Sequence, residues 1–161
     1  MNNPVTIRAA TESDAVEIQA MIAALARDVE GPANVLTIED VKRHGFGSNP
    51  DFYALIAEAD GAIVGVALYF TEFSTWRGKR GVYLQDIYVK PTARSRGVGE
   101  MLIKRLAKEA KALGATYLRL AVDRENLGGA RFYERMNFTE VDRDRIFKLD
   151  GAAFDACAVS D

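Results

Sequence analysis

Hydrophobic and polar positions follow two different periods in the first third of the chain. Val5–Ala10 alternates as a strand does, and the apolar positions after it recur at helical spacing as far as Val29. The intervening Thr11–Asp14 segment has the T-x-x-D spacing of a capping box, and Leu36–Gly45 repeats that start and ends on a glycine. The pattern therefore predicts one strand followed by two helices.

Two apolar runs make up Phe52–Phe70, and the dipeptide Asp60-Gly61 joins them. Both residue types tolerate positive φ, so this dipeptide is a strong signal for a tight hairpin between antiparallel strands. Gly81–Pro91 predicts a third strand of the same sheet, which ends at Pro91 because proline has no N–H to continue a ladder.

The remaining pattern alternates between helices and strands. Val98–Gly114 keeps apolar residues on one helical face, and Thr116–Val122 is apolar enough to be the next strand. A right-handed crossover would make that strand parallel to the one before the helix. Gly128–Phe138 predicts a short helix, and Phe138–Asp142 and Arg145–Leu149 predict a final pair of strands that could form a hairpin.

Composition narrows the class of protein. The chain has 161 residues, a size suited to one domain over residues 1–161, and 48% of them are hydrophobic. A net charge of −2 argues against a nucleic-acid binder, and no apolar run approaches the ~20 residues of a membrane span. No signal-peptide pattern opens the chain, so we expect a cytoplasmic protein. His44 is the only histidine, which excludes metal sites built from several histidines. Cys157 is the only cysteine, so no disulfide can form within the chain.

Ala93–Leu106 contains the clearest functional motif. Its glycines lie where a strand ends and a helix begins, so unpaired backbone N–H groups and the positive end of the helix dipole would attract phosphate. A P-loop is excluded because no Gly-Lys-Ser/Thr occurs, and a dinucleotide fingerprint is excluded because Leu102 stands at its third glycine. What remains is R-x-x-G-x-G, formed by Arg94, Gly97 and Gly99. A plain tight turn with solvated arginines is the alternative.

In this context the motif resembles the pyrophosphate-binding loop of the GNAT family of acetyl-CoA-dependent N-acetyltransferases. The predicted order of elements resembles that family over nearly the whole chain. Five segments resemble its diamine (spermidine/spermine) and thialysine acetyltransferase branch: VTIRAAT, HGFGSNP, VGVALYFTEFSTWRGKRGVYLQDIYV, RSRGVG and NLGGARFYERMNF. The resemblance implies an α/β (α+β) GNAT fold, with a central mixed, mostly antiparallel sheet of about seven strands flanked by about four helices.

The same resemblance implies acetyl-CoA as co-substrate and no metal. Backbone groups of the third sheet strand would bind the pantetheine arm and polarise the thioester, at Ile87, Tyr88 and Val89. The pyrophosphate would lie in the loop made by Arg94, Ser95, Arg96, Gly97, Val98 and Gly99. Asn126 matches a position that contacts the coenzyme arm or the substrate amide, and its alternative role is a helix cap.

Tyr133 is the candidate general acid. It matches the tyrosine of the family's F-Y-E-R-type segment, which lies near the thioester sulfur. A tyrosine has a pKa of about 10 and a thiol about 8.5, so at neutral pH a phenol can protonate a departing thiolate. The alternative is a half-buried aromatic side chain with no chemical role.

The amine site departs from the polyamine enzymes it resembles. Gln85 and Ser74 stand where that branch carries acids, and glutamine cannot act as a base at neutral pH. Asp86 remains as a carboxylate that either binds the amine or has a structural role, and regular alternation would point it away from Gln85. Trp76 either lines the substrate channel or packs on the sheet edge.

Together these features predict transfer of an acetyl group from acetyl-CoA to a primary amine of a small molecule, such as a diamine, polyamine or thialysine-like amino acid. An acyl-CoA-binding regulatory module without transfer, favoured by Gln85, and a protein or peptide N-acetyltransferase are the alternatives. The resemblance also implies a homodimer.

Overall fold

The computed structural model describes residues 3–33 and 35–159, which divide into two units, Met1–Ala121 and Val122–Asp161. The first unit contains β1 (Thr6–Ala9), η1 (Glu12–Asp14), α1 (Ala15–Asp28), α2 (Ile38–Phe46), β2 (Tyr53–Ala59), β3 (Ala62–Ser74), β4 (Lys79–Val89), η2 (Pro91–Ala93), α3 (Val98–Ala112) and β5 (Ala115–Arg119). The second contains α4 (Leu127–Arg135) and α5 (Gly151–Ala158). Whether the two units form the single domain expected over residues 1–161 depends on how they pack together, so that expectation stays a prediction.

The sheet of the first unit is mixed and mostly antiparallel, as the sequence predicts. Its strands lie in the order β1-β2-β3-β4-β5, with antiparallel pairing as far as β4 and a parallel β4–β5 pair. The turn between β2 and β3 has positive φ at both Asp60 (54°) and Gly61 (76°), which confirms the predicted tight hairpin. The parallel pair confirms the predicted crossover through α3.

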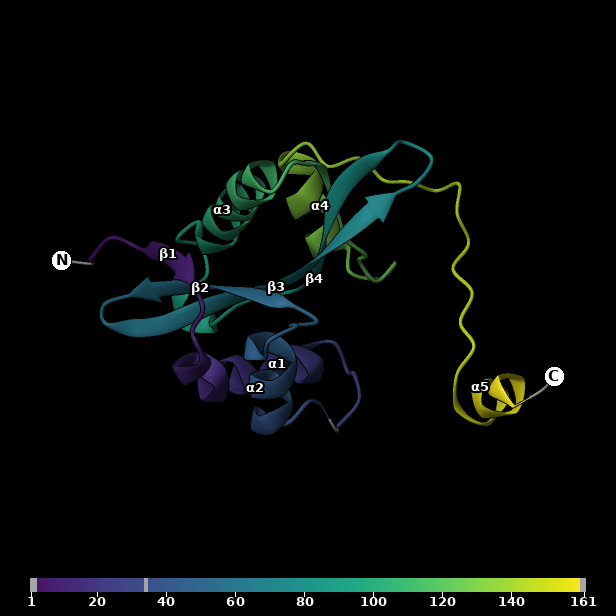
Figure 1. The fold of residues 1–161 in the computed structure, drawn as a ribbon. Helices are drawn as coiled ribbons and strands as arrows, with labels where there is room; N and C mark the ends of the chain where they lie inside the picture. Colours follow the sequence, from purple (N-terminus) through teal and green to yellow (C-terminus); the bar gives the residue numbers. More distant parts are fainter. Residues whose placement is uncertain (1–2, 34, 160–161) are drawn as a thin grey trace. The chain divides into compact units, whose positions relative to one another are not determined.

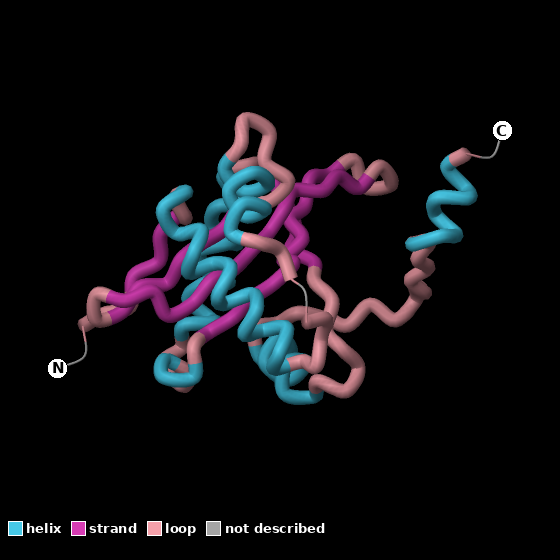
Figure 2. Tube along the Cα trace, turned by 90° about the horizontal axis from the view of Figure 1, so that it is seen from below, coloured by secondary structure: helices cyan, strands magenta, loops and turns pink. Residues whose placement is uncertain are grey.

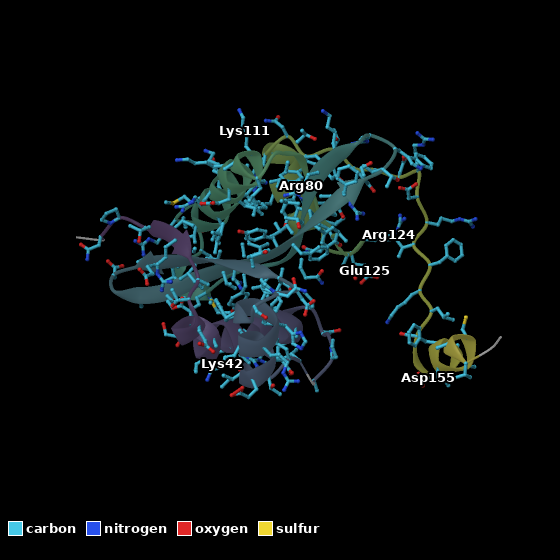
Figure 3. All side chains as sticks on the ribbon, viewed as in Figure 1. Lys42, Arg80, Lys111, Arg124, Glu125 and Asp155 are labelled. Carbon is cyan, nitrogen blue, oxygen red and sulfur yellow. The ribbon has the colours of Figure 1, made fainter. Side chains whose placement is uncertain are left out.

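Helices cover both faces of this sheet. Figure 1 shows α1 and α2 on one face and α3 on the other, and in Figure 2, seen from the side of α1 and α2, helices cross in front of the strands. Lys42 of α2 and Lys111 of α3 accordingly lie on opposite sides of the sheet (Figure 3). The core between the sheet and the first two helices contains Ala15, Ile18, Met21, Ile22, Val41, Ala54, Ile56, Val66, Leu68 and Tyr88.

An ion-pair cluster anchors the start of α1 to the sheet. Arg8 of β1 donates to both oxygens of Asp14, at 2.7 and 2.9 Å, and Asp14 also accepts the backbone N–H of Thr11 at 2.7 Å. The same guanidinium bonds Glu58 of β2 at 2.8 Å. These bonds to Arg8 hold the pKa of the buried Asp14 carboxyl below its usual value.

The second unit corrects one prediction. Residues 139–150 contain no strand, so the predicted C-terminal strands Phe138–Asp142 and Arg145–Leu149 were wrong, and the described sheet has five strands instead of about seven. Alternating side chains make a segment compatible with a strand, but a strand forms only where a neighbouring strand supplies hydrogen bonds. The described chain has five α-helices instead of about four, because the tail forms α5.

Candidate active site

The loop between β4 and α3, called the cradle below, is the candidate anion-binding loop. Ser95 has φ 66°, and Gly97, the N-cap of α3, has φ 73°. Left-handed residues alternating with right-handed ones turn successive N–H groups toward one concave side, as in the nests that bind phosphate. A Cβ added at Gly97 would meet nothing within 4 Å, so positive φ, not crowding, requires glycine here and the space beside it is open. Val98 and Gly99, the first residues of α3, continue the cradle.

Arg94 braces this loop against two other elements. Its Nε donates to the carbonyl of Val89 at 3.0 Å, and its Nη2 donates to Asp28 at the end of α1 at 3.1 Å. The guanidinium also lies over the ring of Tyr88, 5.7 Å from its centroid. Arg94 therefore holds the end of β4 and the end of α1 beside the loop.

Arg96 makes a second brace. It donates to the carboxylate of Asp60, in the β2–β3 turn, at 3.3 Å and to the carbonyl of Asn3 at 3.2 Å. Both guanidinium groups are thus bonded inside the first unit, while the backbone amides of the loop can also donate to a phosphate.

The strand before the loop has an open edge. β5 pairs with β4 only as far as Tyr83, opposite Arg119, whereas β4 continues to Val89. Beyond Tyr83, within the residues that the structure describes, β4 has a strand neighbour on one side only. Ile87, Tyr88 and Val89 lie on this stretch, where outward-facing N–H and C=O groups can bind the amides of an extended ligand as another strand would.

A β-bulge lies at the start of the open stretch. Leu84 is opposite Tyr69 and Asp86 is opposite Leu68, so Gln85 is the extra residue, without a partner on β3. The Gln85 side chain is exposed, and Asp86 is half-buried. The sequence predicted the strand but gave no signal for the bulge, which changes the direction of every side chain after it.

Asp86 is electrostatically unusual. Its carboxylate has no hydrogen bond or ion pair with any residue in the described part of the chain, and burial raises its pKa above the usual aspartate value. A structural carboxylate normally has a cap or a cation as its partner. The structure supplies neither for Asp86.

Trp76 and Ser74 lie away from this stretch. Trp76, in the β3–β4 turn, is 97% exposed, so it packs neither on the sheet edge nor against the bulge. Gln85 lies six residues beyond Lys79, the first residue of β4, which is roughly 20 Å along a strand. Ser74 accepts the backbone N–H of Arg77 at 3.3 Å, a bond that shapes the turn.

Two predicted residues belong to the second unit. Tyr133 on α4 is half-buried between Phe132 and Phe138, with ring centroids 5.1 and 5.5 Å away, and burial raises the pKa of its phenol. Asn126 is the N-cap of α4, and its Oδ1 accepts the backbone N–H of Gly129 at 2.9 Å. The cap is therefore present, and any contact of Asn126 with a coenzyme stays a prediction.

Sequence reasoning missed one cluster, at the point where β5 ends. Arg119 makes a two-pronged bond to Glu72 of β3, at 3.0 and 2.9 Å, and its guanidinium lies 4.9 Å from the ring centroid of Tyr83. Tyr83 in turn stacks on Phe70 at 5.1 Å. These contacts join three strands where β4 and β5 part, and no sequence motif marks them.

No group of three or more His, Cys, Asp or Glu side chains that could hold a metal ion occurs among the described residues. The helices in the described ranges are also not long and apolar enough to cross a membrane.

Comparison with known proteins gives both a family and a fold for this chain. A sequence model described as "Acetyltransferase (GNAT) family" matches residues 18–138. The chain is 36% identical to the thialysine N-epsilon-acetyltransferase of Bos taurus, over 92% of this chain and 94% of that protein, and 38% identical to the Sus scrofa protein of the same name over the same shares. An integron cassette protein of V. cholerae shares the fold, with a TM-score of 0.82 at 19% identity over 97% of this chain and 98% of the other.

Proposed function

This chain belongs to the GNAT family of acetyltransferases, and on that basis we propose that it transfers an acetyl group from acetyl-CoA to a primary amine of a small molecule. One observation carries the proposal: the open edge of β4 leads directly into the left-handed cradle at Ser95 and Gly97. An extended amide-containing arm ending in a pyrophosphate fits such an arrangement.

The chain's own groups would divide the binding work between them. The open edge of β4 would bind the pantetheine amides of acetyl-CoA at Ile87, Tyr88 and Val89, and the cradle from Arg94 to Gly99 would bind the pyrophosphate. Bound acetyl-CoA supplies an activated thioester carbonyl. The same proposal has Asn126 contact the coenzyme arm or the substrate amide.

The proposal assigns Tyr133 the role of general acid. Its raised pKa keeps the phenol protonated at neutral pH, which is the state a donor to a thiolate needs. Tyr133→Phe removes the proton and leaves the aromatic ring. We expect turnover to fall about 10²-fold or more while the affinity for acetyl-CoA stays nearly unchanged. Undiminished turnover would remove Tyr133 from the mechanism.

A thialysine-like amino acid or a diamine is the proposed class of acceptor. Three relatives that match over almost their whole length bear the name thialysine N-epsilon-acetyltransferase, and a partial match is named spermidine/spermine N(1)-acetyltransferase-like. Gln85 replaces an acid at the position where polyamine enzymes would attract a cation, which favours acceptors with fewer charges than spermine. We further propose that the protein acts in the cytoplasm.

Release of free thiol from acetyl-CoA, measured against thialysine, diamines, polyamines, free amino acids and peptides, tests this function. We expect turnover with thialysine or a diamine. Thermal stabilisation by acetyl-CoA without thiol release from any amine would instead indicate an acyl-CoA-binding module, which Gln85 in place of the acid favours. Turnover limited to peptides would indicate a protein N-acetyltransferase.

A homodimer is the proposed assembly. The segment after α4 exposes large apolar side chains, with Ile146 at 87% and Phe147 at 84%. Neighbouring apolar side chains at such exposure are typical of an interaction site, and a second copy of this chain is the proposed partner. The double variant Ile146→Ser/Phe147→Ser should lower the solution mass from dimer to monomer in sedimentation. A monomeric wild-type protein would contradict the assembly and leave the catalytic proposal standing.

A further inference from the structure

We propose that Arg119 binds the α-carboxylate of the acceptor and thereby selects amino acids over diamines and polyamines. This role rests on the proposed acetylation of an amine and narrows the acceptor to one of its classes. Three observations support it: the place of Arg119 at the end of β5, the contacts that fix its guanidinium group, and the donors that those contacts leave free.

Arg119 lies where β4 and β5 part. It is the last residue of β5 and lies opposite Tyr83, beyond which β4 no longer pairs with β5. The open stretch of β4, which would bind the coenzyme arm, begins at this point. An acceptor whose one end is bound by Arg119 would therefore lie beside that stretch.

The strand register shows which face of the sheet carries this guanidinium group. Leu68, Phe70 and Glu72 alternate along β3 and therefore share a face. Leu68 belongs to the core under α1 and α2, whereas Phe70 and Glu72 lie beyond that core. Figure 1 shows the hairpin end of β3 and β4 extending past both helices. Because Arg119 binds Glu72, its guanidinium group lies on the part of this face that α1 and α2 leave uncovered.

The guanidinium group is fixed before any ligand arrives. Its Nε donates to one oxygen of Glu72 at 3.0 Å and its Nη2 to the other at 2.9 Å, and Tyr83, stacked on Phe70, supports it from below. Arg119 lowers the pKa of the Glu72 carboxyl, so both groups are charged at neutral pH. A side chain held in this way loses little conformational entropy when it binds a ligand.

The bond to Glu72 leaves one edge of the guanidinium group free. A guanidinium group has five N–H donors in a planar fork, and Glu72 accepts one from Nε and one from Nη2. Within the described part of the chain, both Nη1 hydrogens and the second Nη2 hydrogen of Arg119 have no acceptor. The edge between Nη1 and Nη2 is the one that can bind a carboxylate through two parallel bonds.

The exposure of the pair favours a carboxylate as the ligand. The side chain of Arg119 is 60% exposed and that of Glu72 is 21% exposed, so an arriving group meets the cation first. A carboxylate would form charge-assisted bonds there, whereas the second ammonium group of a diamine would meet a like charge. Gln85 and Ser74 add no negative charge that would attract that ammonium group.

The length of an amino-acid acceptor fits this placement. Gln85 and Ile87 lie two and four residues beyond Tyr83, which is about 7 and 13 Å along a strand. The five bonds between the α-carbon and the terminal nitrogen of thialysine span about 6 Å when extended. With its carboxylate bound at the end of the Arg119 side chain, thialysine can therefore reach the open stretch of β4 with its terminal amine.

Thialysine and bis(2-aminoethyl) sulfide test this role as a matched pair, because the second is the first without its carboxylate. Thiol release at saturating acetyl-CoA gives kcat/KM for each acceptor. We expect the wild type to prefer thialysine. Arg119→Gln should lose about 10–10²-fold with thialysine, mostly through a raised KM, and should change less than about threefold with the sulfide.

Two further variants separate the carboxylate bond from general effects of charge. Arg119→Lys keeps a cation beside Glu72 but has no planar edge, so it should recover only part of the kcat/KM for thialysine. Arg77→Gln removes the same charge from an exposed residue of the β3–β4 turn and should keep the wild-type preference. Thermal stabilisation of Arg119→Gln by acetyl-CoA, equal to that of wild type, would show that this variant folds and binds the coenzyme.

Several results would overturn this role. An equal loss with both acceptors would show that Arg119 only stabilises the sheet, and a raised KM for acetyl-CoA would show that it binds the coenzyme instead. Wild-type protein that acetylates the sulfide better than thialysine would contradict the role and leave the proposed function standing. If the wild type releases no thiol with any amine of the panel, the proposed function itself fails.

Discussion

The two units of this chain differ in how they bury their side chains. In the first, Ile56 and Leu102 are completely buried on opposite sides of the sheet. In the second, no described residue between 122 and 159 is fully buried, and Phe154 of α5 is 55% exposed. Burial of apolar surface is the main stabilising contribution in folding. The buried apolar side chains therefore lie mainly in the first unit, and we expect that unit to account for most of the stability of the chain.

The largest predicted effect tests whether the first unit accounts for most of the stability. Ile56→Ala removes one methylene and two methyl groups from the core, and we expect the free energy of unfolding to fall by about 2–5 kcal/mol. The matched change Phe154→Ala removes a larger side chain from an exposed position and should alter it by about 0.5 kcal/mol or less. Urea titration measures the free energy of unfolding of both variants. A comparable loss in the two would show that the second unit stabilises the chain as much as the first.

Asp14→Asn should have the next largest effect. It removes the negative charge and one of the two oxygens that accept from Arg8 and the Thr11 N–H, so we expect a loss of about 1–3 kcal/mol at pH 7. Because the folded pKa of Asp14 is lowered, its contribution is fully present above the unfolded pKa of about 3.9. It is then lost as the pH falls further, through the folded pKa.

The measurement is the free energy of unfolding from pH 7 down to pH 3. The wild type should lose stability more steeply than Asp14→Asn as the pH falls below about 4, so the two curves should converge. Parallel curves would show that the Arg8 cluster does not couple to protonation of Asp14.

The smallest predicted effect compares the loss of one helix N-cap in each unit. Thr37, the N-cap of α2, accepts from Asp40 N–H at 3.1 Å, and Asn126, the N-cap of α4, accepts from Gly129 N–H at 2.9 Å. Replacing either by alanine costs about 1 kcal/mol of local helix stability. We expect Thr37→Ala to lower global stability by that amount, and Asn126→Ala to speed amide exchange in α4 alone. Equal global losses would show that α4 unfolds together with the sheet.

Local signals in the sequence predicted much of the first unit. The Asp60-Gly61 turn, the threonine caps and the glycine loop each depend on residues close in sequence, and all are present in the structure. The bulge at Gln85 depends on the register between β3 and β4, which alternation within one strand cannot reveal. The C-terminal hairpin failed for a related reason, since strand-like alternation cannot specify a partner strand.

The candidate site shows the same limit. The cradle was predictable because glycines and a helix start are adjacent in sequence, whereas the Arg119–Glu72 bond joins residues 47 positions apart. Trp76, prominent in the sequence, is simply exposed at a turn. The environment of Asp86 became visible only once the strand register was known.

The two arginine braces have a consequence for how tightly the cradle can hold a ligand. Arg94 and Arg96 fasten the loop to α1 and to the β2–β3 turn, so its backbone is already fixed before any phosphate arrives. Ordering a loose loop on binding would sacrifice affinity, whereas a loop fixed in advance loses little conformational entropy. Removing either brace should therefore weaken the binding of a phosphate-bearing ligand, because the loop would then have to be ordered on binding.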